Sequence, residues 1–207
     1  MKRDKILASL TSRRPSILGL EEFRKYAVLV PLVENDDGLH VLFEVRSNQL
    51  RRQPGEICFP GGKMDKQDKT NQYTAIRETT EELGIVSTQI KDVYPLDYLV
   101  TAFSMVVYPH VGFIEDYQTI KPNPDEVDEV FTVPLSFFLD NGPVIHRVHL
   151  HIEPEKNFPF ELIIGGENYE WGRGVLDEYF YQYEDKVIWG LTARILAHFI
   201  ETISKDS

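Results

Sequence analysis

Three glutamates at helical spacing make up the stretch of the chain most suited to chemistry. Glu78, Glu81 and Glu82 stand at positions i, i+3 and i+4. With 100° between successive helical residues, Glu81 and Glu82 fall at about −60° and +40° from Glu78, so the three carboxylates share one face. Like charges at this spacing repel each other. Magnesium takes oxygen ligands from carboxylates and phosphates, so the pattern predicts a divalent-metal site for phosphate chemistry.

Glycines and an arginine flank these acids at fixed offsets. Gly61 and Gly62 precede the helix and allow both a sharp turn and a close approach of backbone to a ligand. Gly84 follows it, where left-handed helix caps form. Arg77 reaches Glu81 at i+4, but one arginine does not neutralise three acids. A run of acids alone is typical of a solvated helix face. The Gly61-Gly62 turn before the helix, the three acids and Gly84 after it together favour a metal site.

A helix packed on a sheet is needed to position the acids. We expect this helix to run from Thr70 or Asn71 to Leu83, because Gly84 ends the pattern. The residues expected on its packing side, at roughly 140–200° from Glu78, are Ile76, Thr80 and Leu83.

The rest of the chain alternates strand patterns with a few helical ones. Residues 26–33 and 41–46 read as strands joined by a hairpin with an Asp-Gly signal. Further strands are expected at 57–59, 93–100, 106–114, 127–133, 144–152 and 158–164. Helical segments are expected at 3–10, 20–25 and, with amphipathic spacing, 188–203. This order predicts an α+β fold with a mixed sheet between helices, in one domain over 1–207 whose core is 26–200 and whose residues 1–25 form a helical extension.

Composition narrows the classes of function. With 22 basic and 33 acidic residues the formal net charge is −11, which argues against nucleic acid as a partner. Cys58 is the only cysteine, so an intrachain disulfide and a cysteine-rich metal site are excluded. No apolar run approaches the roughly 20 residues that span a bilayer. We therefore expect no membrane association and a cytoplasmic location.

Two longer motifs resemble a known family. Arg77-Glu-Thr-Thr-Glu-Glu-Leu-Gly-Ile85, preceded by Gly62, is similar to the Nudix box, G-x5-E-x7-R-E-U-x-E-E-x-G-U with U aliphatic. It departs from the box in three ways: Gly62 to Arg77 is one residue longer, no glutamate fills the early acid position, and Thr79 replaces an aliphatic residue. The segment from Arg46 to Gly62 resembles the signature of the coenzyme A pyrophosphatase branch, R-S-x-x-L-R-x-H-x-G-x-[IV]-x-F-P-G-G, with Gln53 in place of the histidine.

The resemblance, which covers roughly residues 26–200, implies a Nudix-type α/β/α sandwich and a fuller mechanism. It implies metal-dependent hydrolysis of the diphosphate of coenzyme A or a derivative, giving 3′,5′-ADP and 4′-phosphopantetheine, with Mg²⁺ or Mn²⁺ as cofactor. Glu78 and Glu82 would bind the principal metal, and Glu81 would hold a second metal or polarise water. Arg77 would orient Glu81. An acid outside the box often acts as base in this family, and Glu126 is our candidate, with Glu129 second.

The same resemblance suggests which residues bind substrate. Arg46, Arg51 and Lys63 lie close in sequence to Gly61-Gly62 and are expected to meet phosphates, for which arginine offers paired donors. Two alternatives stay open. One is another Nudix substrate, such as ADP-ribose, a dinucleoside polyphosphate or a nucleoside triphosphate. The other is a sensor that binds a metabolite without cleaving it. A small molecule is the expected partner. The resemblance also suggests a homodimer, because Nudix relatives often pair.

Overall fold

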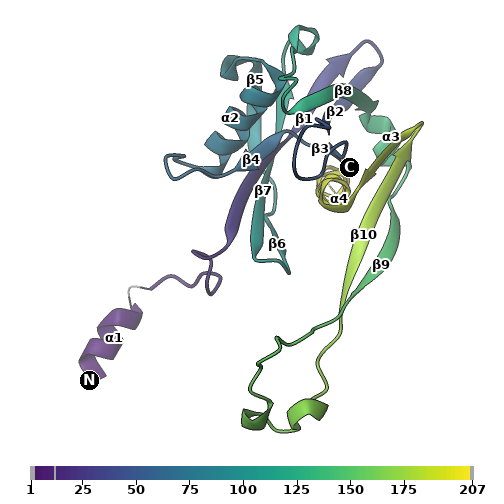
Figure 1. Cartoon of the computed structure of the whole chain (residues 1–207). Coiled ribbons are helices and arrows are strands. Elements are labelled where there is room, and N and C mark those ends of the chain that lie inside the picture. Colours follow the sequence, from purple (N-terminus) through teal and green to yellow (C-terminus); the bar gives the residue numbers. More distant parts are fainter. Residues whose placement is uncertain (1–2, 12, 206–207) are drawn as a thin grey trace.

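The computed structural model describes residues 3–11 and 13–205, and combines a large mixed sheet with four helices in that part of the chain (Figure 1). Its helices are α1 (Arg3–Thr11), α2 (Asn71–Leu83), α3 (Leu135–Asp140) and α4 (Gly190–Ser204). The strands of the large sheet are β1 (Arg24–Asn35), β2 (Gly38–Arg46), β3 (Ile57–Cys58), β4 (Gly61–Lys63), β5 (Ile90–Pro95), β6 (Leu99–Thr101), β7 (Met105–Ile114) and β8 (Val127–Pro134). A smaller sheet holds β9 (Val144–Leu150), β10 (Gly174–Tyr183) and β11 (Lys186–Trp189).

Strand β1 is the centre of the large sheet. It pairs antiparallel with β2 and β4 and parallel with β7, and the last of these ladders runs from Arg24 opposite Met105 to Leu32 opposite Phe113. The β1–β2 hairpin closes with Asn35 opposite Gly38, which confirms the predicted turn. The mixed sheet and its helices confirm the predicted α+β class.

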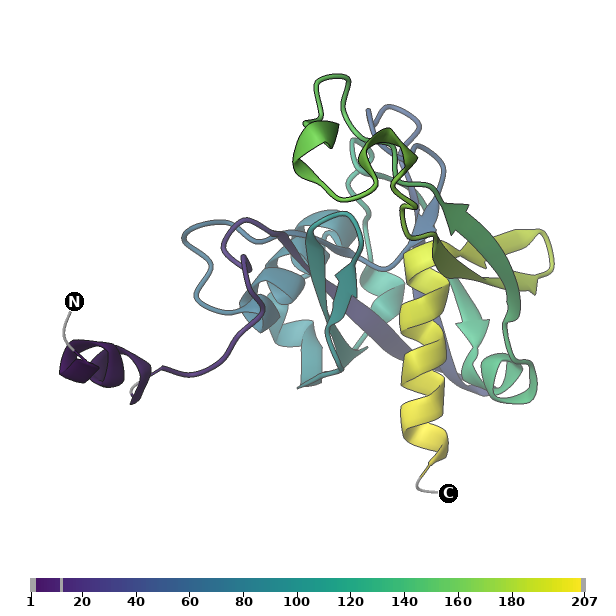
Figure 2. The same ribbon diagram turned by 90° about the horizontal axis from the view of Figure 1, so that it is seen from below.

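The two faces of β1 and β2 are covered by different helices (Figure 2). On one face, Leu29 and Leu42 are fully buried with Leu83 of α2. On the other, Val30 and Phe43 pack into the larger core with Leu196 of α4. Because side chains alternate along a strand, both faces of these strands are apolar and both are used. The structure thus has a sheet sandwiched between α2 and α4, as expected.

The smaller sheet is built differently. Its central strand β10 pairs with β9 on one side and β11 on the other, and α4 packs against β10 and β11. All but the last residue of β9 is exposed. Between β9 and β10 the chain makes a long excursion, residues 151–173, which we call the arm and which projects away from the large sheet in Figure 1.

Several predicted elements were wrong. Residues 20–25 form a turn that leads into β1, not a helix, and 158–164 contains one short 3₁₀ helix, Phe160–Leu162, not a strand. Residues 93–100 span parts of β5 and β6, and the last helix begins at Gly190 because 186–189 pair with β10 as β11. Strands β4 and β10 and helix α3 were missed. Helix α1, by contrast, was predicted and is present. It has no buried residue and lies apart from the sheet (Figure 1).

None of the helices in the described part of the chain is both long and apolar enough to span a bilayer. That the whole chain forms one domain stays a prediction.

Candidate active site

Helix α2 carries the acidic motif and is fixed at both ends. The hydroxyl of Thr70 accepts a hydrogen bond from the Tyr73 backbone N–H at 3.0 Å, which caps the first turn. Gly84 adopts φ 62° and ψ 35°, the left-handed cap. A Cβ on Gly84 would lie 2.1 Å from the backbone oxygen of Lys121, so only glycine fits there. Both predicted helix limits are confirmed.

The three glutamates differ strongly in exposure. The side chain of Glu81 is 53% exposed and that of Glu78 is 19% exposed, whereas Glu82 as a residue is only 6% exposed. Glu82 turns inward and accepts a hydrogen bond from the backbone N–H of Gly61 at 2.7 Å. Glu82 and Glu78 thus share the side of α2 that faces strand β4, and what the helix periodicity did not indicate is that Glu82 is buried there.

The packing side of α2 is also broader than predicted. Leu83 is fully buried and Ile76 packs at the edge of the same core. Thr79 is fully buried in place of Thr80, as is Thr74, and the Thr79 hydroxyl donates to the backbone oxygen of Ala75 at 2.7 Å. Strand β4 and the segment after Lys121 both contact the helix, so more of its circumference is covered than a helix lying on a sheet would require.

The two glycines of β4 touch the acids directly. A Cβ on Gly62 would lie 2.3 Å from the carboxylate carbon of Glu78 and 2.5 Å from each of its oxygens. Gly61 has φ 151°, and a Cβ on it would lie 2.4 Å from the backbone oxygen of Ala27. Glycine at these positions lets the carboxylates of Glu78 and Glu82 approach the backbone of β4. The expected close approach of this backbone to a ligand stays a prediction.

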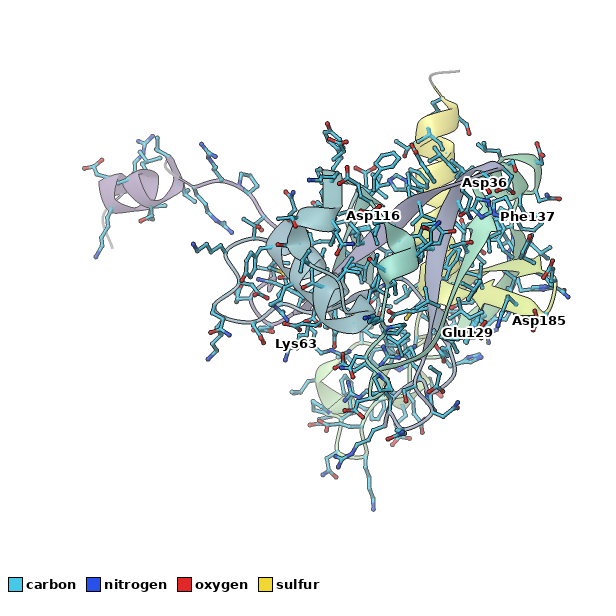
Figure 3. All side chains as sticks on the ribbon, turned by 90° about the horizontal axis from the view of Figure 1, so that it is seen from above. Asp36, Lys63, Asp116, Glu129, Phe137 and Asp185 are labelled. Carbon is cyan, nitrogen blue, oxygen red and sulfur yellow. The ribbon has the colours of Figure 1, made fainter. Side chains whose placement is uncertain are left out.

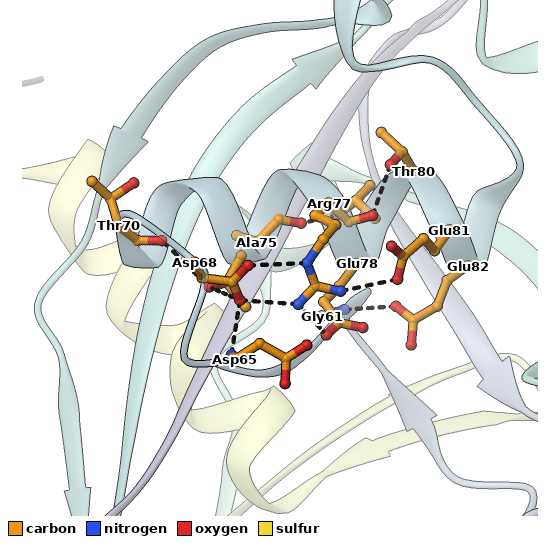
Figure 4. A network of polar contacts seen from close by, with 12 residues as sticks. Gly61, Asp65, Asp68, Thr70, Ala75, Arg77, Glu78, Thr80, Glu81 and Glu82 are labelled. Atoms are coloured by element: carbon orange, nitrogen blue, oxygen red, sulfur yellow. Dashed lines mark hydrogen bonds and ion pairs between the residues drawn. The ribbon is translucent and has the colours of Figure 1, made fainter.

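Arg77 holds the motif together (Figure 4). Its guanidinium donates to Glu78 Oε1 at 2.8 Å, to Glu81 Oε2 at 3.0 Å and to both oxygens of Asp68, at 3.2 and 3.0 Å. Asp68 also accepts from the Asp65 N–H at 2.9 Å. The hydrogen bonds from Arg77 lower the pKa of Asp68 to about 2. Arg77 therefore orients Glu78 as well as Glu81, and Asp68 orients Arg77.

A fourth acid, which the motifs did not indicate, is buried beside the three. Glu44 of β2 is 1% exposed, and burial raises its pKa from 4.5 to about 7. One of its oxygens accepts a hydrogen bond from the Cys58 thiol at 3.3 Å. Burial, followed by the charge of Glu44, raises the pKa of Glu82 well above its ordinary value. The only sequence signal for Glu44 was an acid within the apolar run Leu42-Phe43-Glu44-Val45.

Of the two candidate bases, Glu126 lies beside the acids. The backbone N–H of Asn123 donates to the carbonyl of Glu82 at 2.9 Å, which docks the segment containing Glu126 against the end of α2. The charge of Glu126 adds, after burial, to the raised pKa values of Glu44, Glu78 and Glu82.

Glu129, the second candidate, is engaged elsewhere. It accepts hydrogen bonds from the Lys186 ammonium at 2.8 and 2.7 Å, on the side of the smaller sheet. Figure 3 shows Glu129 toward Asp185 and well separated from Lys63 at the end of β4. The geometry therefore ranks Glu126 first.

The three cationic residues expected to bind phosphate occupy different environments. Arg46 ends β2 and is half-buried, with its Nε buried and without a hydrogen-bond partner among the described residues. Arg51, in the loop between β2 and β3, and Lys63, at the end of β4, are exposed. Contact of any of the three with substrate stays a prediction.

Within residues 3–11 and 13–205, no three histidine, cysteine or carboxylate side chains already converge as a metal-binding group. The carboxylates instead bind the N–H and guanidinium groups around them, such as Gly61 N–H on Glu82 and Arg77 on Glu78.

Comparison with known proteins identifies the family. The model of the NUDIX domain matches residues 23–149, which is more than half of the chain. The chain belongs to the Nudix family. Its Nudix motif is the segment whose geometry is described above, from the Gly61–Gly62 strand to Gly84.

Curated Nudix relatives include proteins named for coenzyme A. The chain is 46% identical over 115 residues to the mouse peroxisomal coenzyme A diphosphatase NUDT7, covering 56% of this chain and 49% of that protein. It is 34% identical over 212 residues to the chloroplastic Nudix hydrolase 22 of Arabidopsis thaliana, covering 94% of this chain and 64% of the relative. The chain thus spans about half to two thirds of the length of these relatives.

A solved Nudix structure has the same fold. A MutT/nudix family protein from Enterococcus faecalis superimposes with a TM-score of 0.52 at 16% sequence identity, covering 99% of this chain and 70% of that one. At this identity the likeness concerns the fold alone.

Proposed function

We propose that the protein hydrolyses the diphosphate bond of coenzyme A or a derivative of it, with Mg²⁺ or Mn²⁺, giving 3′,5′-ADP and 4′-phosphopantetheine. Membership of the Nudix family supports hydrolysis of a diphosphate. The Arg46–Gly62 signature and the 46% identity to a coenzyme A diphosphatase support the substrate.

One observation carries the proposal: the carboxylates of Glu78 and Glu82 both contact the backbone of the Gly61–Gly62 strand. This arrangement brings two carboxylates and the peptide groups of the glycines of β4 to one place. The buried Glu44 and the half-buried Glu126 add further negative charge nearby. A divalent cation would offset this mutual repulsion, and oxygen donors are the ligands that Mg²⁺ prefers, so the donor set fits the cofactor.

Each residue has a defined part in the proposed reaction. Glu78 and Glu82 would hold the principal Mg²⁺ or Mn²⁺, which supplies charge neutralisation for the diphosphate and a more acidic bound water. Glu81, exposed and oriented by Arg77, would bind a second ion or polarise water. Glu126 would accept the proton of the attacking water.

Substrate phosphates would be met by the cations of the signature. Arg46 and Arg51 belong to it, and Lys63 follows the Gly-Gly turn. The proposal assigns at least one of these residues to the 3′-phosphate of coenzyme A. It follows that coenzyme A is cleaved with a higher kcat/KM than dephospho-coenzyme A.

Mass spectrometry of the products tests the proposal. Incubation with coenzyme A and Mg²⁺ is expected to give 3′,5′-ADP and 4′-phosphopantetheine, and Glu82→Gln serves as the inactive control. Faster cleavage of ADP-ribose, a dinucleoside polyphosphate or a nucleoside triphosphate in the same assay would show that the enzyme prefers another Nudix substrate. Binding of coenzyme A without any cleavage would make it a sensor. A homodimer and a cytoplasmic location stay predictions, and the relatives' names include peroxisomal and chloroplastic proteins.

A further inference from the structure

A buried carboxylate oxygen on β2 has no hydrogen-bond partner in residues 3–11 and 13–205. Glu44 is 1% exposed, and its Oε1 accepts a hydrogen bond from Cys58 Sγ at 3.3 Å. Its Oε2 is buried and makes no hydrogen bond to any described residue. Buried carboxylates are costly unless they are paired or bind a metal, so this oxygen calls for an explanation.

The strand geometry shows where Glu44 points. Leu42 packs in the core beneath α2, with Leu83, whereas Phe43 packs in the core beneath α4. Because side chains alternate along a strand, Glu44 faces α2 like Leu42. It lies on the face from which Glu82 approaches, so the two carboxylates come from opposite sides, one from the sheet and one from the helix.

Neighbouring contacts place Glu44 at the same point along the sheet as the Gly-Gly turn. Glu44 pairs with Cys58 of β3, and β3 continues through Phe59 and Pro60 directly into Gly61. Gly61 in turn donates to Glu82.

We propose that Glu44 is a metal-binding residue outside the Nudix motif, whose Oε2 completes, from the sheet side, the coordination of a divalent cation held by Glu82. The inference rests on the metal dependence in the proposed function. It adds a ligand that neither the motif nor the coenzyme A signature specifies.

A purely structural role for Glu44 does not explain why its Oε2 lacks a hydrogen bond to any described residue. The obvious structural partner is Arg46, two residues along and on the same face of β2. Arg46 Nε is itself buried and unpartnered among the described residues, so it does not satisfy Glu44 Oε2. The strand thus presents a free acceptor and a free donor side by side. A cation on the first and a phosphate oxygen on the second would satisfy both.

Metal binding without substrate tests the inference. Isothermal titration with Mn²⁺ alone is measured for the wild type, for Glu44→Gln and for the matched control Glu115→Gln, an acid 60% exposed and paired with Lys91. We expect Glu44→Gln to raise the Kd for Mn²⁺ about tenfold or more, in the range seen when residues around metal sites are removed. Glu115→Gln should leave it unchanged. Glu44→Asp keeps the charge on a shorter stem and should give an intermediate Kd, and it provides the test if the glutamine variant does not fold.

Thermal unfolding gives a second readout. In EDTA, Glu44→Gln should melt at a higher temperature than the wild type, because an uncompensated buried carboxylate is removed. With saturating Mn²⁺ the wild type should gain more stability than the variant. An unchanged Kd for Mn²⁺ in Glu44→Gln would overturn the inference, even if coenzyme A is cleaved. A weakened Kd in a protein that leaves coenzyme A intact would uphold the inference and reject the proposed substrate.

Discussion

The face of the large sheet under α2 and the arm beyond β9 show opposite relations between sequence and structure. Under α2, side chains are held by contacts so close that Gly62 has no room for a methyl group. In the arm, Leu162 is 77% exposed and Ile164 is 97% exposed, and a Cβ on Gly172 would meet no atom within 4 Å. Close contacts therefore restrict the residue type at Gly62, whereas these three positions of the arm have no comparable restriction.

Replacing an acid of the α2 face should have the largest effect. Glu82→Gln removes a proposed metal ligand, and the loss of about 4 kcal/mol of transition-state stabilisation lowers kcat about a thousandfold. Coenzyme A hydrolysis at saturating Mg²⁺ measures it. Near wild-type turnover would remove Glu82 from the catalytic machinery.

Replacing one glycine in each region by alanine compares the α2 face with the arm directly. In Gly62→Ala the new methyl group displaces the Glu78 carboxylate, which is the mobile end of a side chain, so we expect kcat to fall about a hundredfold, equivalent to about 2.7 kcal/mol, while the protein still folds. Gly172→Ala in the arm should alter neither kcat nor the melting temperature. Circular dichroism with the hydrolysis assay separates the two properties. Equal effects at both positions would contradict the contrast.

The link between Asp68 and Arg77 predicts a dependence of stability on pH. The pKa of Asp68 is lowered to about 2, so its contribution is present above its ordinary value of 3.8 and is lost as pH falls through 2. Asp68→Asn should therefore melt a few degrees below the wild type at pH 7, and the difference should shrink between pH 4 and pH 2. If the difference in melting temperature between Asp68→Asn and the wild type stays constant from pH 4 to pH 2, the charge of Asp68 does not contribute to stability.

The smallest effect is expected in the arm. Ile164→Ser changes a side chain that is almost wholly exposed, and such substitutions alter stability by about 0.5 kcal/mol or less. Hydrolysis of coenzyme A should also be unchanged. A loss of activity would show that the arm contributes to substrate binding and would make the two regions one functional unit.

The sequence predicted the α2 face well because its signals are local. The hairpin turn at residues 36–37, the Thr70 cap and the Gly84 stop depend on neighbouring residues, and all three are present. The inward turn of Glu82 depends on Gly61, which lies across the fold. Periodicity within one helix could not show this contact.

Elsewhere, apolar composition was a poor guide. Residues 158–164 have a strand-like composition, but Phe158 packs edge-on against Trp171 across the arm, at 5.4 Å between ring centroids. β10 was missed because its buried positions are few and acids interrupt them. Glu44 was missed because no motif includes it, although its place on the face of Leu42 is the kind of signal that could have found it.

The parallel pairing of β1 with β7 has a consequence for how the protein is made. The pairing joins residues about 80 positions apart, and β4 and α2 both lie within the loop that it closes. Closing such a loop costs entropy before contacts repay it, which slows folding. A nascent chain that has not yet reached Met105 therefore has the acids of α2 and strands β1 to β4, but lacks the strand that pairs in parallel with β1. The ribosome must release nearly the whole of β7 before this protein acquires its catalytic geometry.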